Sequence, residues 1–431
     1  MLELLHLNNV GPAPAMKLDL APRLNLITGD NGLGKSFLLD VAFWALTRRW
    51  PAEVNPKLGS GLMARPLAAD EASIEFSFHS KVKKERYRSR FDRRAEAWIG
   101  RPGRPANPGL VIYALSDGGF AVWDPARNYW KRQGDTDVQE RLPAYVFSTR
   151  EVWDGLKQGD ADVSVGLIAD WGLWQKENGP AFRQLVDVLV SLSPSPDDHI
   201  TPGALTKFSI DDGRWMPTLR MPYGVDVPVL TVSAAMKRII ALAYVLVWSW
   251  QEHVRAAGFL HEARTSQVTL LIDEIESHLH PRWQRTIVGS LLGVMNSLAS
   301  SAKVQVIAAT HSPLLLASVE PTFDPELDAW FDLDLERRNG SASVQLRRRE
   351  FVRHGDVSNW LTSEAFDLKR ARSVEAEAAI ERARELLRRK RRPTLDAALA
   401  VDAALRKAAL PDIDPFWVRW GAFMEALGVP Q

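Results

Sequence analysis

Residues 24–36, LNLITGDNGLGKS, restrict what this chain can fold into more than any other segment. A short apolar run leads into a glycine-rich stretch, and apolar residues at helical spacing follow it. The stretch fits the pattern G-x-x-x-x-G-K-[ST] at every fixed position. A buried strand, a glycine loop and a helix therefore follow one another in the order that a phosphate-binding loop requires.

This loop suits the binding of a nucleoside triphosphate with Mg²⁺. Glycines let the backbone curl with its N–H groups inward, and the start of the next helix adds a partial positive charge. We expect Lys35 to reach the β- and γ-phosphates and Ser36 to be a ligand of Mg²⁺. A plain glycine turn is the alternative, but it does not need all of the fixed residues. The residues predicted to contact ATP here are Gly29, Asn31, Gly32, Gly34, Lys35, Ser36 and Phe37.

The composition of the whole chain excludes several classes of protein. At 431 residues it has room for two or three domains, and its net charge of +1 gives no overall reason to bind nucleic acid. It has no cysteine, which excludes disulfide bonds and thiolate metal sites. The N-terminus lacks the layout of a signal peptide, and the most apolar run, 239–250, is too short to span a bilayer. We expect a cytoplasmic protein that makes no use of a membrane.

The order of apolar runs and turns predicts an α/β fold with four regions. An N-terminal lobe with the phosphate loop covers 1–174, and a helical insertion covers 175–253. The rest of the core covers 254–322, and a C-terminal region of strands and helices covers 323–431. A small antiparallel sheet in the first region is predicted from runs at 72–80, 86–91, 110–115 and 119–123.

Basic residues are concentrated between positions 81 and 104. Such a run can follow the phosphate backbone of DNA, or it can be the solvated face of an edge hairpin. Both interpretations stay open. The residues are Lys81, Lys83, Lys84, Arg86, Arg88, Arg90, Arg93, Arg94, Arg101 and Arg104. A second basic run, 388–392, lies at the end of a predicted helix, where positive charge also suits the helix terminus.

A second apolar run, 268–272, ends in two acidic residues and is typical of a central parallel strand. Asp273 would hold Mg²⁺ through its water shell. Glu274, which faces the other way, would orient and deprotonate the attacking water. Adjacent acids can also form a solvated turn, but together with the phosphate loop they favour a catalytic pair.

The order of four motifs, GDNGLGKS, VSAAMKR, LLIDEIESHLHP and ATHSP, resembles the ABC-type ATPase heads. Within that superfamily the chain is similar to the stand-alone SMC/RecF/OLD-like group, which includes AAA-type and AbiEii-like ATPases. The ATPase subunits of Septu-type and retron-associated anti-phage systems are of this kind. The motifs span residues 1 to about 320, which is most of the chain.

The resemblance implies a role for each matching residue. Lys35 and Ser36 match the Walker A residues, Asp273 and Glu274 match Walker B, and His311 matches the histidine that senses the γ-phosphate. The implied catalytic residues are Glu274, Lys35 and His311.

Three further assignments come from the same resemblance. Ser233 and Arg238 match the signature motif, which caps the ATP bound by a second subunit, and 276–281 matches the D-loop. Gln175 is a candidate for the Q-loop glutamine and so for a third contact to Mg²⁺ beside Ser36 and Asp273. Ala235 departs from the family, which has glycine there, and restricts the backbone near a γ-phosphate.

We therefore expect an ABC-type ATPase that dimerises around ATP and controls a partner effector in anti-phage defence. Resemblance to the Septu ATPase subunit makes an HNH-type nuclease the expected effector, and this chain itself shows no nuclease centre. Two alternatives stay open: a RecF-like DNA-repair ATPase that holds DNA through residues 81–104, and an ATP-dependent assembly scaffold that does not hydrolyse ATP.

Overall fold

The computed structural model describes residues 1–67, 71–80, 83–100, 106–128, 143–338, 341–366, 368, 372–388 and 393–429. The chain divides into two compact units, Met1–Gly355 and Asp356–Gln431.

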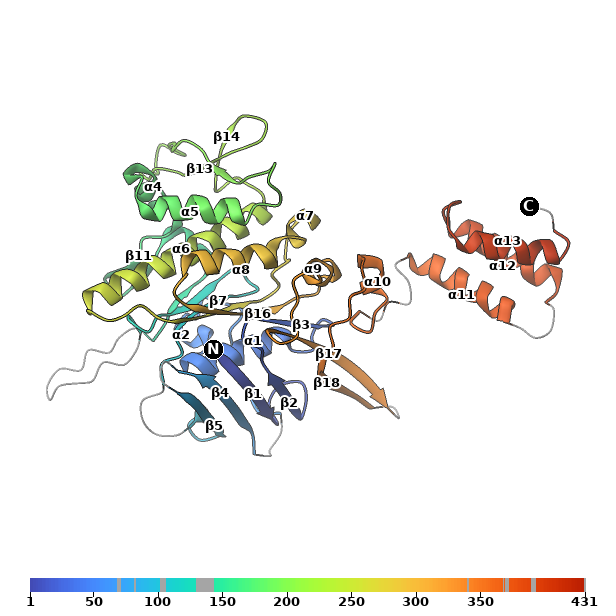
Figure 1. Cartoon of the computed structure of the whole chain (residues 1–431), viewed down its shortest axis with the longest axis horizontal. Coiled ribbons are helices and arrows are strands. Elements are labelled where there is room, and N and C mark those ends of the chain that lie inside the picture. Colours follow the sequence, from blue (N-terminus) through green and yellow to red (C-terminus); the bar gives the residue numbers. More distant parts are fainter. Residues whose placement is uncertain are drawn as a thin grey trace. The chain divides into compact units, whose positions relative to one another are not determined.

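The first unit is built on a sheet with eight strands in the described part of the chain, ordered β18-β17-β3-β16-β15-β7-β8-β9 (Figure 1). The strands are β3 (Leu24–Gly29), β7 (Leu110–Ala114), β8 (Phe120–Trp123), β9 (Tyr145–Phe147), β15 (Gln267–Ile272), β16 (Lys303–Ala309), β17 (Asp328–Arg338) and β18 (Ser341–Arg349). From β17 to β7 the strands are parallel, and antiparallel strands flank them. The carboxyl ends of β3, β16, β15 and β7 therefore meet at one edge.

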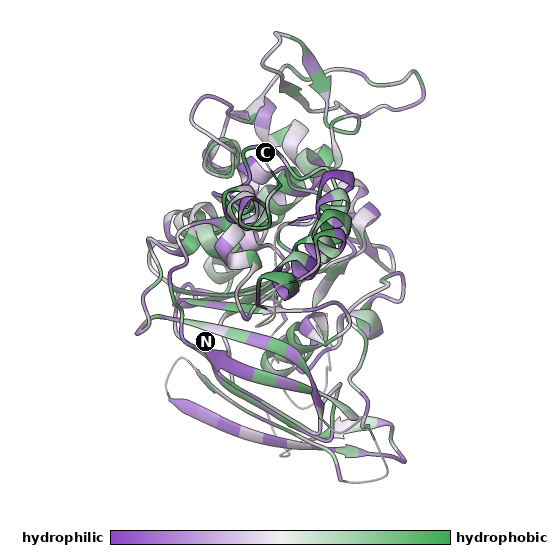
Figure 2. Cartoon of the chain, turned by 90° about the vertical axis from the view of Figure 1, so that its right-hand side faces the viewer, coloured by the Kyte–Doolittle hydropathy of each residue, from purple (hydrophilic) through white to green (hydrophobic). Residues whose placement is uncertain are grey.

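A second, antiparallel sheet is ordered β2-β1-β4-β5-β6. Its strands are β1 (Leu2–Asn8), β2 (Ala15–Asp19), β4 (Ser73–His79), β5 (Lys84–Asp92) and β6 (Ala97–Ile99). Helix α1 (Lys35–Thr47) lies between the two sheets, and one hydrophobic core joins all three. Because both sides of α1 are covered, the helix is apolar on nearly every face. Figure 2 shows hydrophilic and hydrophobic residues alternating along the strands of the antiparallel sheet.

The predicted α/β class and the antiparallel sheet are confirmed, but two of the four runs that predicted this sheet belong elsewhere. The runs at 110–115 and 119–123 form β7 and β8 of the main sheet, and β1 and β2 complete the antiparallel one. Every residue of β7 is buried, because the strand pairs with β15 in the interior. A continuous apolar run fits a central strand better than an edge strand.

Helices cover the other face of the main sheet, where α6 (Ala234–Phe259) and α8 (Ile287–Leu298) lie over it in Figure 1. The other helices of this unit are α2 (Pro51–Val54), α3 (Thr149–Asp154), α4 (Leu167–Glu177), α5 (Pro180–Ser191), α7 (Pro281–Gln284) and α9 (Pro313–Val319). Two small sheets, β10 (Leu156–Gln158) with β11 (Ala161–Ser164) and β12 (Thr201–Pro202) with β13 (Thr218–Arg220) and β14 (Asp226–Pro228), complete it. Each helix in the described part of the chain is either too short or too polar to span a lipid bilayer.

The second unit contains α10 (Val357–Leu361), α11 (Val374–Arg388), α12 (Leu395–Lys407) and α13 (Phe416–Ala426). The last three share a hydrophobic core around Ile380, Leu405 and Trp420. The units divide after Gly355, later than the predicted start of a C-terminal region at 323, because β17 pairs with β3 and so belongs to the main sheet.

Candidate active site

The phosphate loop connects β3 to α1 and needs glycine at two positions. Gly29 has φ 134°, and a Cβ there would lie 2.3 Å from the carbonyl oxygen of Leu333 on β17. Gly34 is the N-cap of α1 with φ 103°, and a Cβ there would lie 2.8 Å from Pro12. Side chains at these positions would therefore strain or displace the loop. The loop presents its backbone at the N-terminus of α1, where anions are favoured.

Lys35 folds back over this loop. Its ammonium donates hydrogen bonds to the carbonyl oxygens of Gly29 at 2.7 Å and of Asp30 at 2.8 Å. Only 5% of Lys35 is exposed, and burial lowers the pKa of its amine against the opposing charges of Asp273 and Asp30. The structure thus holds a cationic side chain within the loop.

Asp273 follows β15, which is separated from β3 by β16 alone. It is 1% exposed, and in the described part of the chain neither carboxylate oxygen accepts a hydrogen bond of good geometry, although the hydroxyls of Ser36 and Ser116 lie close to it. Burial raises its pKa, and the charge of Glu274 raises it further, while the hydroxyls of Ser36 and Ser116 and the charge of Arg238 lower it. An unpartnered buried carboxylate is costly unless a cation or proton joins it.

The residues at this point fit Mg²⁺. The Asp273 carboxylate and the Ser36 hydroxyl are neighbours, and Mg²⁺ prefers oxygen ligands. No group of three or more acidic or histidine side chains able to hold a metal occurs among the described residues. Mg²⁺ in nucleotide sites is commonly bound by one or two protein ligands and completed by water and phosphate oxygens.

The turn that carries Glu274 has an unusual backbone. Glu274 has φ 48°, in the left-handed region that non-glycine residues rarely adopt. The guanidinium of Arg238, on α6, donates hydrogen bonds to the carbonyl oxygens of Asp273 at 2.9 Å and of Glu274 at 3.1 Å. Arg238 therefore supports the acidic turn of its own chain. The role predicted for it, capping the ATP of a second subunit, stays a prediction.

His311 follows β16 and faces the phosphate loop. Burial and the charge of Lys35 lower its pKa, while the charge of Glu274 and a hydrogen bond with the backbone of Gly29 raise it. The carboxylate of Glu276 accepts a hydrogen bond from the backbone N–H of His311, so it links the acidic turn to the histidine loop. The structure brings together Lys35, Ser36, Asp273, Glu274 and His311, and the catalytic roles predicted for them stay predictions.

Three other predicted residues lie differently. Ser233 is exposed at the N-cap of α6, where its hydroxyl accepts from the N–H of Met236. Both ends of the Gln175 amide are engaged within the helical insertion, by the indole N–H of Trp171 and the carbonyl of Gly203. The ring of Phe37 lies against Gly11. The metal-binding role of Gln175 and the nucleotide contact of Phe37 stay predictions, as do contacts by the exposed Asn31 and Gly32.

The sequence did not single out two residues of this cluster. Ser116 follows β7, and its hydroxyl lowers the pKa of Asp273. Tyr113, on β7, donates to the buried Asp40 of α1 at 2.8 Å. The signal that could have revealed both is the continuous apolar run of β7, because the carboxyl end of a parallel strand beside β15 reaches the same edge.

Three basic residues on β5, Lys84, Arg86 and Arg88, are paired with acids on β4 and β1. Glu75 on β4 contacts Arg86 and Arg88, and Lys84 contacts Glu3 on β1. These pairs neutralise much of the local charge, which supports the reading of a solvated sheet face. Lys81, Arg101, Arg104 and 389–392 lie outside the described residues. The DNA contact predicted for residues 81–104 stays a prediction.

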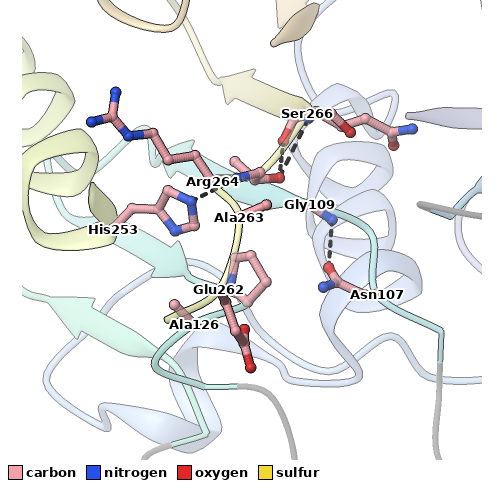
Figure 3. Close-up of a pocket in the computed structure, with 11 residues that line it drawn as sticks. Asn107, Gly109, Ala126, His253, Glu262, Ala263, Arg264 and Ser266 are labelled. Atoms are coloured by element: carbon pink, nitrogen blue, oxygen red, sulfur yellow. Dashed lines mark hydrogen bonds between the residues drawn. The ribbon is translucent and has the colours of Figure 1, made fainter. Parts of the chain in front are cut away.

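A cavity of about 60 Å³ lies at the amino end of β15, away from the phosphate loop (Figure 3). His253 lines it and resembles half of a catalytic dyad, with Nδ1 2.7 Å from the Asp124 carboxylate. Its Nε2 accepts a 2.8 Å hydrogen bond from the backbone N–H of Thr265. Because both ring nitrogens are engaged, this pair anchors α6 and does not serve as a base.

The sheet order, the phosphate loop and the acidic pair define a P-loop ATPase head of the ABC type. The family model "AAA domain, putative AbiEii toxin, Type IV TA system" matches residues 24–317, and the chain belongs to this family. The match contains the phosphate loop, the acidic turn and the histidine loop. The family predicted from the motifs is thus confirmed.

The proteins that are similar to this chain include the following two. "Septu protein PtuA" of Bacillus thuringiensis is 21% identical over 314 residues, which are 72% of this chain and 71% of that protein. "Retron Vc95 probable ATPase" of Vibrio cholerae serotype O1 biovar El Tor is 33% identical over 96 residues, 22% of this chain and 17% of that protein. Among solved structures, "SMC head domain from Thermotoga maritima" is 13% identical with a TM-score of 0.37, and 80% of this chain and 98% of that chain are covered.

Proposed function

We propose that this chain binds and hydrolyses ATP with Mg²⁺, and that ATP joins two copies of it. The observation that carries the proposal is the convergence of Lys35, Ser36, Asp273, Glu274 and His311 at one edge of the sheet. A lysine inside the loop, a partnerless carboxylate beside a hydroxyl and a further carboxylate are the parts that phosphoryl transfer to water requires.

The residues would divide the work as follows. Lys35 exchanges its bonds to the loop carbonyls for phosphate oxygens, and Ser36 and Asp273 hold the metal. Mg²⁺ supplies charge neutralisation on the phosphates. Glu274 accepts the proton of the attacking water, and its turn is held by Arg238. His311 responds to the γ-phosphate, because its ring faces Lys35 and Gly29.

The geometry of α6 supports a sandwich of two heads. Ser233 is exposed at the start of this 26-residue helix, where a hydroxyl and a helix N-terminus can both face an anion. Each Ser233 would cap the ATP held by Lys35 of the other copy. Ala235, buried in the first turn of α6, motivates the alternative of a scaffold that binds ATP without turnover.

The proposed task is control of a partner effector in anti-phage defence, with an HNH-type nuclease as the expected partner. Its support is the similarity to proteins of a Septu system and of a retron. The C-terminal unit, which has a core of its own, offers a further surface for such a partner.

The test is the molar mass of Glu274→Gln protein by light scattering, with and without Mg-ATP, beside the ATPase rate of the wild type. ATP should raise the mass, and Ser233→Arg should prevent the rise. A wild type that assembles but does not turn ATP over would support the scaffold instead. A mass that is indifferent to ATP would contradict the sandwich.

A further inference from the structure

A cavity of about 250 Å³ lies beside the acidic turn, on the side of α6. The turn after β7, the first turns of α6 and the turn after β15 line it, together with one residue of α8 and two of α3. We call it the α6 cavity. The lining residues that matter below are Lys237, Arg238, Ala241, Leu242, Ile275 and Leu279.

Most of its wall is apolar. Leu242, Ile275 and Leu279 are almost fully buried from bulk water yet face this space. For comparison of size, an enclosed apolar cavity of about 150 Å³ has room for benzene. The α6 cavity therefore has room for an apolar group larger than one aromatic ring.

The lining of the α6 cavity has two cationic side chains, Lys237 and Arg238, and one carboxylate, that of Asp117. The ammonium of Lys237 has no hydrogen bond or ion pair within the described residues. The guanidinium of Arg238 donates hydrogen bonds to the backbone carbonyls of Asp273 and Glu274. The carboxylate of Asp117, which also lines the cavity, accepts from the N–H groups of Gly59 and Gly119. A ligand with one acidic group would complement Lys237.

We propose that the α6 cavity binds a small apolar anion, in which an aromatic or branched aliphatic group fills the apolar part and a carboxylate or sulfonate pairs with Lys237. Its occupancy changes the rate of ATP turnover, because Ile275 and Arg238 join the cavity to the turn of Asp273 and Glu274. This second step rests on the proposed ATPase function, whereas binding itself does not.

Calorimetric titration of the full chain with naphthalene-2-sulfonate, without nucleotide, tests the binding. One saturable site per chain is expected, and the neutral naphthalene-2-sulfonamide should bind about tenfold more weakly. Equal affinity for the two probes would overturn recognition of an anion and leave an apolar side chain of a protein partner as the occupant. The absence of saturable binding would overturn the site.

Two variants and a control locate the bound probe. Lys237→Met should weaken the sulfonate about tenfold and leave the sulfonamide unchanged, and Ala241→Leu should weaken both by filling the cavity. Lys303→Met, at the exposed start of β16, removes a charge elsewhere and should change neither. If Ala241→Leu fails to fold, the Lys237 variant decides. Sulfonate affinity that survives Lys237→Met, or falls equally with Lys303→Met, would contradict the assignment.

The coupling is tested by ATP turnover at saturating sulfonate. A change of at least threefold that is lost in Lys237→Met is expected. An unchanged rate in a chain that binds the probe and hydrolyses ATP would overturn the coupling. Binding in a chain without any ATPase activity would instead contradict the proposed function and leave the site standing.

Discussion

The phenol of Tyr113 donates a 2.8 Å hydrogen bond to the carboxylate of Asp40, and this pair is buried between α1 and the main sheet. Asp40 follows Ser36 by one helical turn, so it lies beneath the phosphate loop. Burial raises the pKa of Asp40 to about 7, and the charges of Asp273 and Asp117 add to that effect while the bond from Tyr113 opposes it. A buried carboxyl group with a raised pKa, that of Asp40, therefore lies next to the candidate active site.

Replacement of Asp40 by asparagine should remove the loss of folding stability that ionisation of this carboxyl causes as pH rises. A carboxyl whose pKa is raised on folding binds its proton more tightly in the native state, so stability falls as pH rises from about 4 to about 7. Asp40→Asn should therefore gain stability relative to the wild type over that interval, by about 3 kcal/mol. Urea unfolding at pH 5 and pH 7.5, followed by circular dichroism, measures the gain. A difference between the two proteins that does not change with pH would contradict it.

Variants of Lys35 and of Glu274 should lose different properties, the first nucleotide affinity and the second turnover. Lys35→Ala removes the ammonium that holds the loop and faces the phosphates, so nucleotide affinity should fall at least tenfold. Glu274→Gln keeps the shape of the turn and loses the base, so turnover should fall by about 10²–10⁴ with affinity kept. Fluorescent-nucleotide titration and a phosphate-release assay separate the two. Lys303→Ala serves as the control, and weak binding by Glu274→Gln would count against its role as a base.

The parts of the site that the sequence predicts are those built from continuous segments. Strand β3, the phosphate loop and α1 form one local pattern, and Asp273 and Glu274 directly end an apolar strand. His311 follows β16 in the same way. Because parallel strands bring their carboxyl ends to one edge, these segments meet once the sheet forms.

The parts that sequence patterns do not reveal depend on pairing between distant segments. Strand β7 pairs with β15, which is far from it in the sequence, and this pairing brings Ser116 close to Asp273. The bonds from Arg238 to backbone carbonyls leave no trace in hydrophobic periodicity. The later boundary between the two units likewise follows from the pairing of β17 with β3.

Asp273→Asn should stabilise the chain without nucleotide while it removes the effect of magnesium. Neither carboxylate oxygen accepts a hydrogen bond of good geometry among the described residues, and burial raises the pKa of this group although the nearby hydroxyls of Ser36 and Ser116 oppose that rise, so its ionised form costs stability at pH 8. The amide should raise the unfolding free energy by about 1–2 kcal/mol. Thermal unfolding with and without Mg-ATP tests this, since Mg-ATP should stabilise only the wild type. If Asp273→Asn is less stable than the wild type without nucleotide, the ionised Asp273 carboxylate does not destabilise the wild-type fold, and the prediction is wrong.

Glu320 should control access to the segment that ends the first unit. Its buried carboxylate, just after α9, accepts hydrogen bonds from the backbone N–H groups of His354 at 2.7 Å and of Gly355 at 3.1 Å. Hydrogen bonds to a charged group contribute about 1.5–3 kcal/mol each, so Glu320→Ala should open this segment more often. Arg353 is exposed and directly precedes it, and trypsin should cleave there about tenfold faster in the variant.

Limited trypsin digestion, followed by mass spectrometry of the fragment that begins at His354, measures the rate of this cleavage. Glu326→Ala is the matched control, because Glu326 is an exposed acid in the same connection between α9 and β17. The bonds from Glu320 hold the backbone immediately after Arg353, and a protease needs that backbone extended and free. Equal cleavage rates in the wild type and both variants would mean that the segment is held by other contacts.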